Sequence, residues 1–247
     1  MGAWGAKGAW GAKGARSAKG ARSAMSANDI KLHVVPTLTH GRVLVREPRA
    51  VAQKGILVGF HGYMENARIQ MERLAAIPGS SAWTLVSIQG LHRFYRGRTD
   101  DVVASWMTRE DRDEAIADNL GYVAAALEHV PHDQSTRVVY TGFSQGVAMA
   151  FRAAVLGTAR AVAIAAVGGD VPPELLEDQA RRFPAVLFTR GARDEWLTQP
   201  RFDRDVTALS GRSIALTTRV YDGAHEWNGE VSEAIGEFLK TLPSRYS

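Results

Sequence analysis

The sequence contains no cysteine among its 247 residues, so disulfide bonds and thiolate chemistry are both excluded. Long apolar runs are also missing, because no segment approaches the roughly 20 residues of a membrane-spanning helix. The start of the chain has no continuous apolar stretch of the kind found in a secretion signal. These absences predict a cytoplasmic protein without a membrane span.

Acidic residues are absent from the first 28 positions, where glycine recurs every few residues. From Gly2 the run reads GAWGAK, GAWGAK, GARSAK and GARSA, and Met25 stands where a fourth lysine would fall. Trp4 and Trp10 are its only sizeable apolar side chains, so the run has no face to bury, and its glycines raise the entropy cost of ordering the backbone. We expect residues 1–27 to be a low-complexity, disordered extension and residues 28–247 to form one domain.

Two other interpretations of this extension remain open. Its five basic side chains, Lys7, Lys13, Arg16, Lys19 and Arg22, are compatible with an arm that binds nucleic acid or a membrane surface. An organelle transit peptide is also basic and poor in acids, but the run lacks an amphipathic face. The whole chain has a formal charge of +4, and subtracting the five basic residues leaves −1 for the rest. Because the body is close to neutral, we predict no nucleic-acid partner for it.

Short runs rich in valine and isoleucine alternate with longer amphipathic patterns in the body of the chain. The short runs predict strands at 31–35, 42–47, 55–60, 83–88, 137–142, 160–167, 185–190 and 213–220. The longer patterns predict helices at 64–77, 111–130, 145–156, 173–182, 199–210 and 229–242. Two early strands followed by strand–helix alternation predict an α/β fold with a mostly parallel sheet covered on both faces. Catalytic groups on such a sheet belong at the carboxyl ends of the strands.

The strand at 137–142 runs directly into GFSQG, residues 142–146, and then into a predicted helix. Serine in a G-x-S-x-G turn between strand and helix indicates a nucleophile elbow, which lifts the hydroxyl of Ser144 out of the sheet. Gly142 and Gly146 remove side chains that would collide in such a sharp turn. The Gln145 backbone N–H would then begin a helix, where the helix dipole favours negative charge.

A serine hydroxyl needs a base, and the seven histidines are His33, His40, His61, His92, His129, His132 and His225. His225 is favoured because VYDGAHEWNGE follows the last predicted strand, which places this imidazole at a strand's carboxyl end. Asp194, in the loop after the preceding strand, is the favoured third group. Glu195 and Asp170 are its rivals, and Asp170 has the alternative role of capping the next helix.

The turn after the strand at 55–60 offers a second donor for an oxyanion. GILVGFHGYMENA ends that strand with His61-Gly62, and the Tyr63 backbone N–H can point to the same place as the Gln145 N–H. In this interpretation His61 orients the turn and does not act as the base.

The segment GLHRFYRGRTDDVVASWMTRED (90–111) is expected to be a loop beside the site. One interpretation is a substrate-lining flap in which Trp106 and Met107 form a wall for the acyl group. The other is a surface loop whose arginines pair with Asp100, Asp101 and neighbouring acids. Two further tryptophans, which follow the candidate acid and base, are expected to wedge their loops and not to contact substrate: Trp196 and Trp227.

The motifs GFHGYMENA, GFSQGVAMA, GARDEW and DGAHEW together resemble the serine α/β-hydrolases, especially the phospholipase/carboxylesterase and dienelactone-hydrolase-like branch. The resemblance implies an α/β-hydrolase fold without a large cap domain, and backbone N–H donors at Tyr63 and Gln145. Two positions depart from the pattern. Val147 stands where related esterases commonly have glycine, and Ser144 stands where dienelactone hydrolases proper have cysteine, so dienelactone itself is not an expected substrate.

The expected activity is hydrolysis of carboxylic esters, with small or short-chain acyl groups favoured because no long insertion can form a lid. Three alternatives stay open: a peptidase, a perhydrolase, and a hydrolase of acyl thioesters or lysophospholipids. A non-catalytic binding protein is disfavoured because Ser144, Asp194 and His225 are all present. No metal-ligand cluster or dinucleotide motif occurs, so we expect no metal and no cofactor. The expected partner is a small-molecule ester, and no oligomeric state is predicted.

Overall fold

The computed structural model describes residues 31–49, 53–133 and 135–243 of the chain. The chain divides into two units, Met1–Pro36 and Thr37–Ser247. In the first unit the described residues 31–36 form neither helix nor strand, so the predicted strand at 31–35 is wrong. Leu32 and Val35 are exposed, and no described strand pairs with this segment. Alternating apolar residues make a strand only where a partner strand and a buried face are available.

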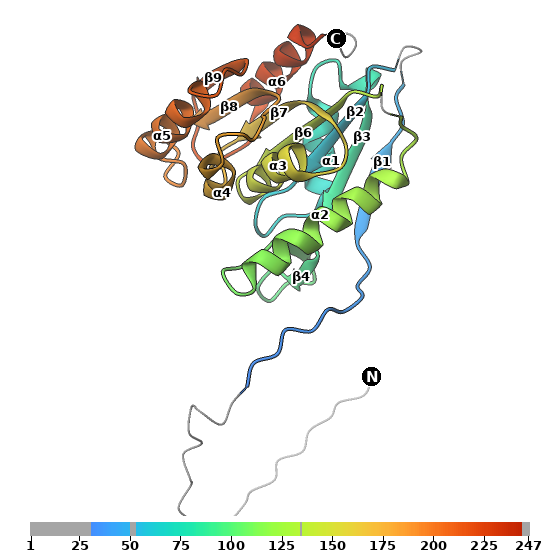
Figure 1. Cartoon of the computed structure of the whole chain (residues 1–247). Helices are drawn as coiled ribbons and strands as arrows, with labels where there is room; N and C mark the ends of the chain where they lie inside the picture. Colours follow the sequence, from blue (N-terminus) through green and yellow to red (C-terminus); the bar gives the residue numbers. More distant parts are fainter. Residues whose placement is uncertain (1–30, 50–52, 134, 244–247) are drawn as a thin grey trace, which may run out of the picture. The chain divides into compact units, whose positions relative to one another are not determined.

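A seven-stranded sheet forms the centre of the second unit (Figure 1). In their order across the sheet, the strands are β1 (Arg42–Arg46), β3 (Thr84–Gln89), β2 (Ile56–Phe60), β6 (Val138–Phe143), β7 (Ala161–Val167), β8 (Ala185–Gly191) and β9 (Leu216–Tyr221). Strand β1 runs antiparallel to β3, and all other neighbouring pairs are parallel. The predicted α/β architecture with a mostly parallel sheet is therefore confirmed.

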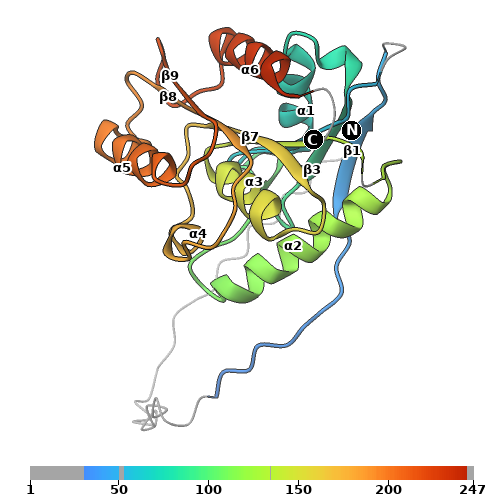
Figure 2. The same cartoon turned by 45° about the horizontal axis from the view of Figure 1, so that its top comes forward.

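Helices cover both faces of this sheet (Figure 2). One face carries α1 (Ala67–Ala76) and α6 (Gly229–Thr241). The other carries α2 (Arg112–Glu128), α3 (Gln145–Leu156), α4 (Pro173–Glu177) and α5 (Gln199–Ser210). Because side chains alternate along a strand, Leu57 packs in the first core and Val58 in the second. Strands buried on both faces explain the nearly continuous apolar runs in the sequence. Of the described helices, none is long and apolar enough to cross a membrane.

Local hydrogen bonds set two helix boundaries that differ from the predictions. Helix α1 begins at Ala67 and not at residue 64, because the Asn66 side chain accepts hydrogen bonds from the Arg68 and Ile69 N–H groups. Helix α4 ends at Glu177 and not at residue 182. There the Asp178 carboxylate accepts the Ala180 N–H at 2.9 Å, a local turn that competes with helix continuation.

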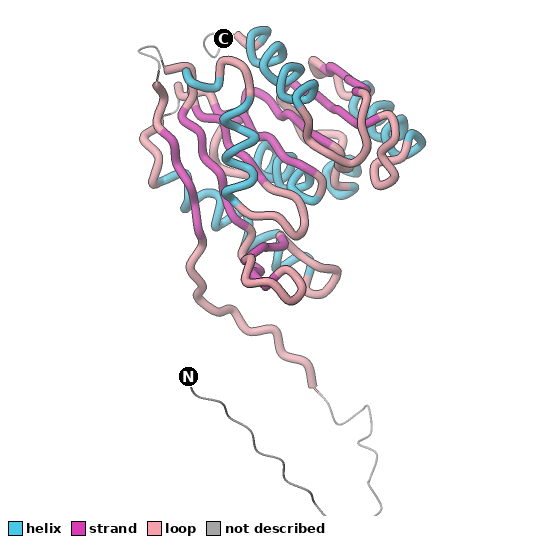
Figure 3. The backbone as a smooth tube through the Cα atoms, turned by 180° about the vertical axis from the view of Figure 1, so that it is seen from behind, coloured by secondary structure: helices cyan, strands magenta, loops and turns pink. Residues whose placement is uncertain are grey.

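The segment expected to be a loop at 90–111 contains a β-hairpin, β4 (His92–Tyr95) and β5 (Val102–Ser105), which Figure 3 shows beyond one end of the main sheet. An antiparallel bridge joins Ala104 to Glu65 in the turn after β2. Among the described residues, no arginine side chain of this segment forms an ion pair with Asp100 or Asp101, although the Arg96 backbone N–H donates to the Asp101 carbonyl at 2.9 Å. Instead the Arg96 guanidinium donates to the Met64 carbonyl at 3.0 Å. The hairpin is thus attached to the turn that carries Tyr63.

The order of the strands creates one natural place for a site. Strands β2 and β6 are neighbours in the sheet, but the helices that follow them, α1 and α3, lie on opposite faces. The two connections therefore diverge at the carboxyl ends of these strands, which is the position where open α/β sheets generally bind ligands. Ser144 follows β6 directly, and Tyr63 lies three residues beyond the end of β2.

Candidate active site

Ser144 occupies a strained turn between β6 and α3. Its backbone angles are φ 51° and ψ −118°, a region that residues other than glycine rarely adopt. A Cβ atom on Gly142 would lie 2.2 Å from the Gly146 carbonyl oxygen, and one on Gly146 would lie 2.2 Å from that of Phe60. The two glycines therefore permit the tight turn that the G-x-S-x-G pattern predicts.

Three side chains from different loops form a continuous chain of hydrogen bonds. The Ser144 hydroxyl lies 2.8 Å from His225 Nε2, and His225 Nδ1 lies 3.0 Å and 3.1 Å from the two carboxylate oxygens of Asp194. Asp194 is buried, and its Oδ1 also accepts the N–H groups of Trp196 and Leu197 at 2.8 and 2.9 Å. These bonds fix the carboxylate so that the imidazole donates from Nδ1 and accepts from Ser144 at Nε2.

The rival acids are placed elsewhere. The Asp170 carboxylate forms an ion pair with Arg201. Helix α4 takes Pro172 as its N-cap, without a side-chain hydrogen bond, so Asp170 does not cap it. Glu195 is exposed. Of the three acids considered, the structure brings only Asp194 to His225.

The loop that carries His225 is anchored on both sides. The Tyr221 hydroxyl donates to the Glu226 carbonyl at 2.5 Å, and the Trp227 indole N–H donates to the Ser232 hydroxyl at 3.0 Å. Burial, reinforced by the charges of Asp194 and Glu226, raises the pKa of Tyr221 to about 12, so the hydroxyl keeps its proton for this bond. The imidazole is thus held over Ser144 by the folded loop around it.

Two backbone N–H groups are available for an oxyanion. The Gln145 N–H is in the first turn of α3, whose opening N–H groups have no partner within the helix. The Tyr63 N–H lies in the turn after β2, where the preceding Gly62 N–H is already bonded to Glu65 Oε2 at 2.7 Å. Among the described residues, no acceptor is bonded to the backbone N–H of Tyr63 or to that of Gln145. Both groups are therefore free to bind a developing negative charge.

The backbone groups of Trp106 and Met107 bind the side chain of Gln145, which follows Ser144 in the turn between β6 and α3. Trp106 is completely buried and its indole N–H donates to the His61 carbonyl at 2.8 Å, so it is a core residue and not a wall for substrate. The Gln145 side chain accepts the Trp106 N–H at 3.0 Å and donates to the Met107 carbonyl at 2.9 Å. Met107 is half-buried, with its sulfur 3.5 Å from an Arg152 nitrogen. The sequence predicted a loop here and did not predict strand β5, which ends directly before Trp106.

His61 joins the turn after β2, which contains Tyr63, to Gly90 after the neighbouring strand β3. This histidine is fully buried; its Nε2 accepts the Gly90 N–H at 2.9 Å, and its Nδ1 donates to the Gly62 carbonyl at 2.7 Å. The Gly90 donor requires an unprotonated Nε2, so the ring is neutral. Burial lowers the pKa of His61, although the Gly62 bond and the charge of Glu65 act in the opposite direction. The arrangement agrees with the expectation that His61 orients the turn.

An open hollow of about 230 Å³ lies beside Ser144. Its lining combines glycines, apolar side chains and one ion pair: Ser144, Gln145, Ala148, Gly168, Gly169, Asp170, Trp196, Leu197 and Arg201. Trp196 is 70 % exposed, so the expectation that it wedges its loop is wrong, and it borders the hollow instead. Gly169 is required here, because a Cβ atom would lie 2.3 Å from the Ser144 carbonyl oxygen.

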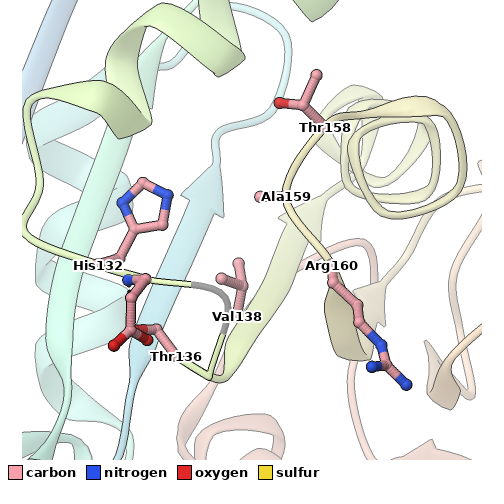
Figure 4. A pocket seen from close by; sticks show the side chains of 7 residues that line it. His132, Thr136, Val138, Thr158, Ala159 and Arg160 are labelled. Atoms are coloured by element: carbon pink, nitrogen blue, oxygen red, sulfur yellow. Dashed lines mark hydrogen bonds between the residues drawn. The ribbon is translucent and has the colours of Figure 1, made fainter.

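A larger hollow of about 500 Å³ lies at the opposite, amino-terminal ends of β6 and β7 (Figure 4). His132, Thr136, Thr158 and Arg160 contribute polar groups to it. None of the candidate catalytic side chains reaches this hollow. Among the described residues, no cluster of three or more histidine, aspartate or glutamate side chains is placed to hold a metal ion.

Comparisons with known proteins agree with this fold. The family model of the dienelactone hydrolase family matches residues 92–231, more than half of the chain. Among curated proteins no match was found.

Solved structures share the fold at low sequence identity. Esterase PE8 has a TM-score of 0.69 and 18% identity over 83% of this chain and 100% of its own. Acyl-protein thioesterase 2 of Zea mays has a TM-score of 0.64 and 17% identity over 81% of this chain and 98% of its own. The carboxylesterase of Bacillus cereus has a TM-score of 0.62 and 14% identity over 81% of this chain and 93% of its own.

The buried neutral His61 predicts a pH dependence of stability. Its folded-state pKa lies below the ordinary value of 6.5, so below about pH 6.5 the unfolded chain binds a proton that the folded chain resists. The free energy of unfolding should therefore fall as the pH drops from 6.5 towards the lowered pKa, with no contribution above that range. For His61→Gln we expect a shallower fall, by at most about 1.4 kcal/mol per pH unit, in urea titrations between pH 7 and 5.

His129→Gln is the control, because His129 is exposed and should leave the slope unchanged. A slope in His61→Gln equal to that of the wild type would contradict the assignment of a neutral His61.

Proposed function

The chain belongs to the dienelactone hydrolase family, and we propose that it is a serine hydrolase that cleaves carboxylic esters through an acyl-serine intermediate. The observation that carries the proposal is the hydrogen-bonded chain from Ser144 through His225 to Asp194, with distances of 2.8 and 3.0 Å. A nucleophile bonded to a base, which is bonded in turn to an orienting acid, is the arrangement that activates a hydroxyl.

The first half of the reaction forms the acyl-enzyme. His225 Nε2 accepts the hydroxyl proton as Ser144 Oγ attacks the ester carbonyl carbon. The oxyanion that forms accepts hydrogen bonds from the N–H groups of Tyr63 and Gln145. Asp194 stabilises the resulting imidazolium through Nδ1. The tetrahedral adduct then collapses, and the leaving alkoxide takes the proton from His225 and departs as the alcohol.

The second half releases the acid. His225 takes a proton from a water molecule, whose oxygen attacks the acyl carbon, and the second oxyanion uses the same two N–H groups. When this adduct collapses, the proton on His225 returns to Ser144 Oγ and the carboxylic acid leaves. Every proton and electron pair is balanced by groups of this chain, the ester and water.

The hollow beside Ser144 supports small or short-chain acyl groups. Its volume is about 230 Å³, and the ion pair between Asp170 and Arg201 lies on its lining. A long alkyl chain would have to contact this pair or extend over the surface. The β4–β5 hairpin packs on the turn after β2, and none of its residues lines the hollow.

The direct test is covalent labelling. A fluorophosphonate probe should modify Ser144 of the full-length protein, as mapped by peptide mass spectrometry, because it reacts with activated serines that have an oxyanion site. Ser144→Ala should be unlabelled and should not hydrolyse p-nitrophenyl acetate. Labelling of a different serine, or an equally active Ser144→Ala, would refute the proposed nucleophile.

The third member of the triad is tested by isosteric substitution. Asp194→Asn keeps the shape of the side chain but removes the charge and the tautomer control, so we expect kcat to fall by several orders of magnitude, about 10⁴-fold as in other triads. The thermal midpoint should change far less. Glu195→Gln is the matched control on the next, exposed position and should keep wild-type kcat.

Asp170→Asn should lower kcat far less than Asp194→Asn, because its carboxylate faces Arg201 and not His225. If instead Asp170→Asn were inactive and Asp194→Asn kept the wild-type kcat, Asp194 would not be the orienting acid.

Acyl-chain selectivity follows from the small hollow. Esters of acids with about two to six carbons should give higher kcat/KM than palmitoyl esters, because the ordinary gain of roughly 0.8 kcal/mol per buried methylene stops where the hollow ends. A series of p-nitrophenyl esters and matched acyl thioesters measures this. A steady rise in kcat/KM up to sixteen-carbon chains would contradict a short acyl site.

A further inference from the structure

An ion pair between α1 and the oxyanion turn lies beside the proposed site. Arg73 Nη1 lies 2.6 Å from Glu65 Oε2, and Arg73 Nη2 lies 2.7 Å from Glu65 Oε1. Both side chains are only 16% exposed. Two parallel bonds between a planar guanidinium and a carboxylate fix the direction of both groups, which a single contact between flexible side chains does not.

The carboxylate of this pair also holds the backbone next to a proposed oxyanion donor. Glu65 Oε2 accepts the Gly62 N–H at 2.7 Å. The peptide that follows supplies the Tyr63 N–H, so a rotation of Gly62 would turn that donor away from the oxyanion. Space is tight here as well, since a Cβ atom on Gly62 would lie 3.0 Å from Glu65 Oε2 and from the Phe143 ring.

The guanidinium of the pair contacts the two other loops of the site. Arg73 Cζ lies 4.4 Å from the centroid of the Phe143 ring and 5.8 Å from that of Trp227, both within the range of cation–π attraction. Phe143 immediately precedes Ser144, and its ring lies 5.1 Å from the His225 ring. Trp227 is two residues beyond His225 in the chain.

Strands β2, β6 and β9 thus lead into three separate loops. The ion pair contacts one residue within two positions of the proposed catalytic group of each loop. We propose that Arg73, acting with Glu65, is a positioning residue that holds the Tyr63 donor, the Ser144 turn and the His225 loop in mutual register. This inference rests on the proposed ester hydrolysis and adds to it a residue that touches neither substrate nor the reacting atoms. Lysine would keep the positive charge of Arg73. It would lose the two parallel hydrogen bonds to Glu65 and the planar group that packs on the Phe143 ring.

If Arg73 positions the catalytic groups, its replacement should lower kcat and leave KM nearly unchanged. The groups held by the pair act mainly on the charge that develops in the transition state, so their displacement should lower kcat and leave ground-state binding nearly intact. Displacement of catalytic groups by about 1 Å costs on the order of 10²-fold. For Arg73→Met we expect kcat per active site to fall by about that factor, with KM for p-nitrophenyl acetate within about threefold of wild type. Arg73→Lys and Glu65→Gln should give intermediate losses.

The experiment measures kcat and KM of the full-length variants per fluorophosphonate-titrated site, together with the thermal midpoint. Arg68→Met is the charge-matched control on an exposed position of the same helix. Leu209→Ala, in the buried face of α5 away from the site, controls for loss of stability alone. We expect both controls to keep kcat per titrated site within about twofold, although Leu209→Ala lowers the midpoint.

Three outcomes would overturn the inference. The first is a kcat of Arg73→Met equal to that of the control Arg68→Met. The second is a loss of kcat in Arg73→Met that is no larger than the loss in Leu209→Ala, when the two variants have similar thermal midpoints. The third covers the case in which Arg73→Met fails to fold: unchanged kcat in both Arg73→Lys and Glu65→Gln. A wild-type protein that neither labels nor hydrolyses esters would instead refute the proposed function itself. An active wild type with unaffected Arg73 variants refutes only the positioning role.

Discussion

The close approach of α3 to the end of β2 is the constraint on which the site depends. Gly146 packs so closely on the Phe60 carbonyl that even a methyl group would lie 2.2 Å from its oxygen. This contact brings the first turn of α3 against the strand that leads into Tyr63, so the two candidate N–H donors come from segments that are forced together. The same contact requires the strained backbone of Ser144, and the paired strands β2 and β6 hold that strain in place.

Around this contact, three polar side chains that are buried or half-buried bind backbone groups of neighbouring loops. His61 joins Gly62 to Gly90, Gln145 joins the nucleophile turn to residues 106 and 107, and Glu65 holds the Gly62 N–H. Each satisfies its own hydrogen-bonding capacity and removes a rotation from a loop that carries a candidate catalytic group. The rigidity of the site therefore comes from side chains that the proposed chemistry never uses.

The sequence predicted the parts of this structure that depend on local pattern and chain order. The seven main strands and Ser144 follow from apolar runs and a short motif, and the strand-end rule brought His225 and Asp194 into consideration. Contacts between segments distant in sequence were not predictable in this way. The burial of Trp106 depends on a hairpin of two four-residue strands joined by a turn rich in arginine and aspartate. The pairing of Arg73 with Glu65 depends on where α1 begins. The segment at 31–35 has the alternation of a strand but no partner.

The position of β9 at the border of the sheet has a consequence for how activity is lost on heating. Strand β9 pairs only with β8, and its residues 217–220 are exposed, whereas the strand that precedes Ser144 has neighbours on both sides. Edge elements open at lower free energy than central strands. Fraying of β9 and the loop after it would carry the imidazole away from a hydroxyl that stays in place on an intact central sheet. For the proposed triad, loss of activity and global unfolding would then be separate events, because His225 would leave Ser144 before the core unfolds.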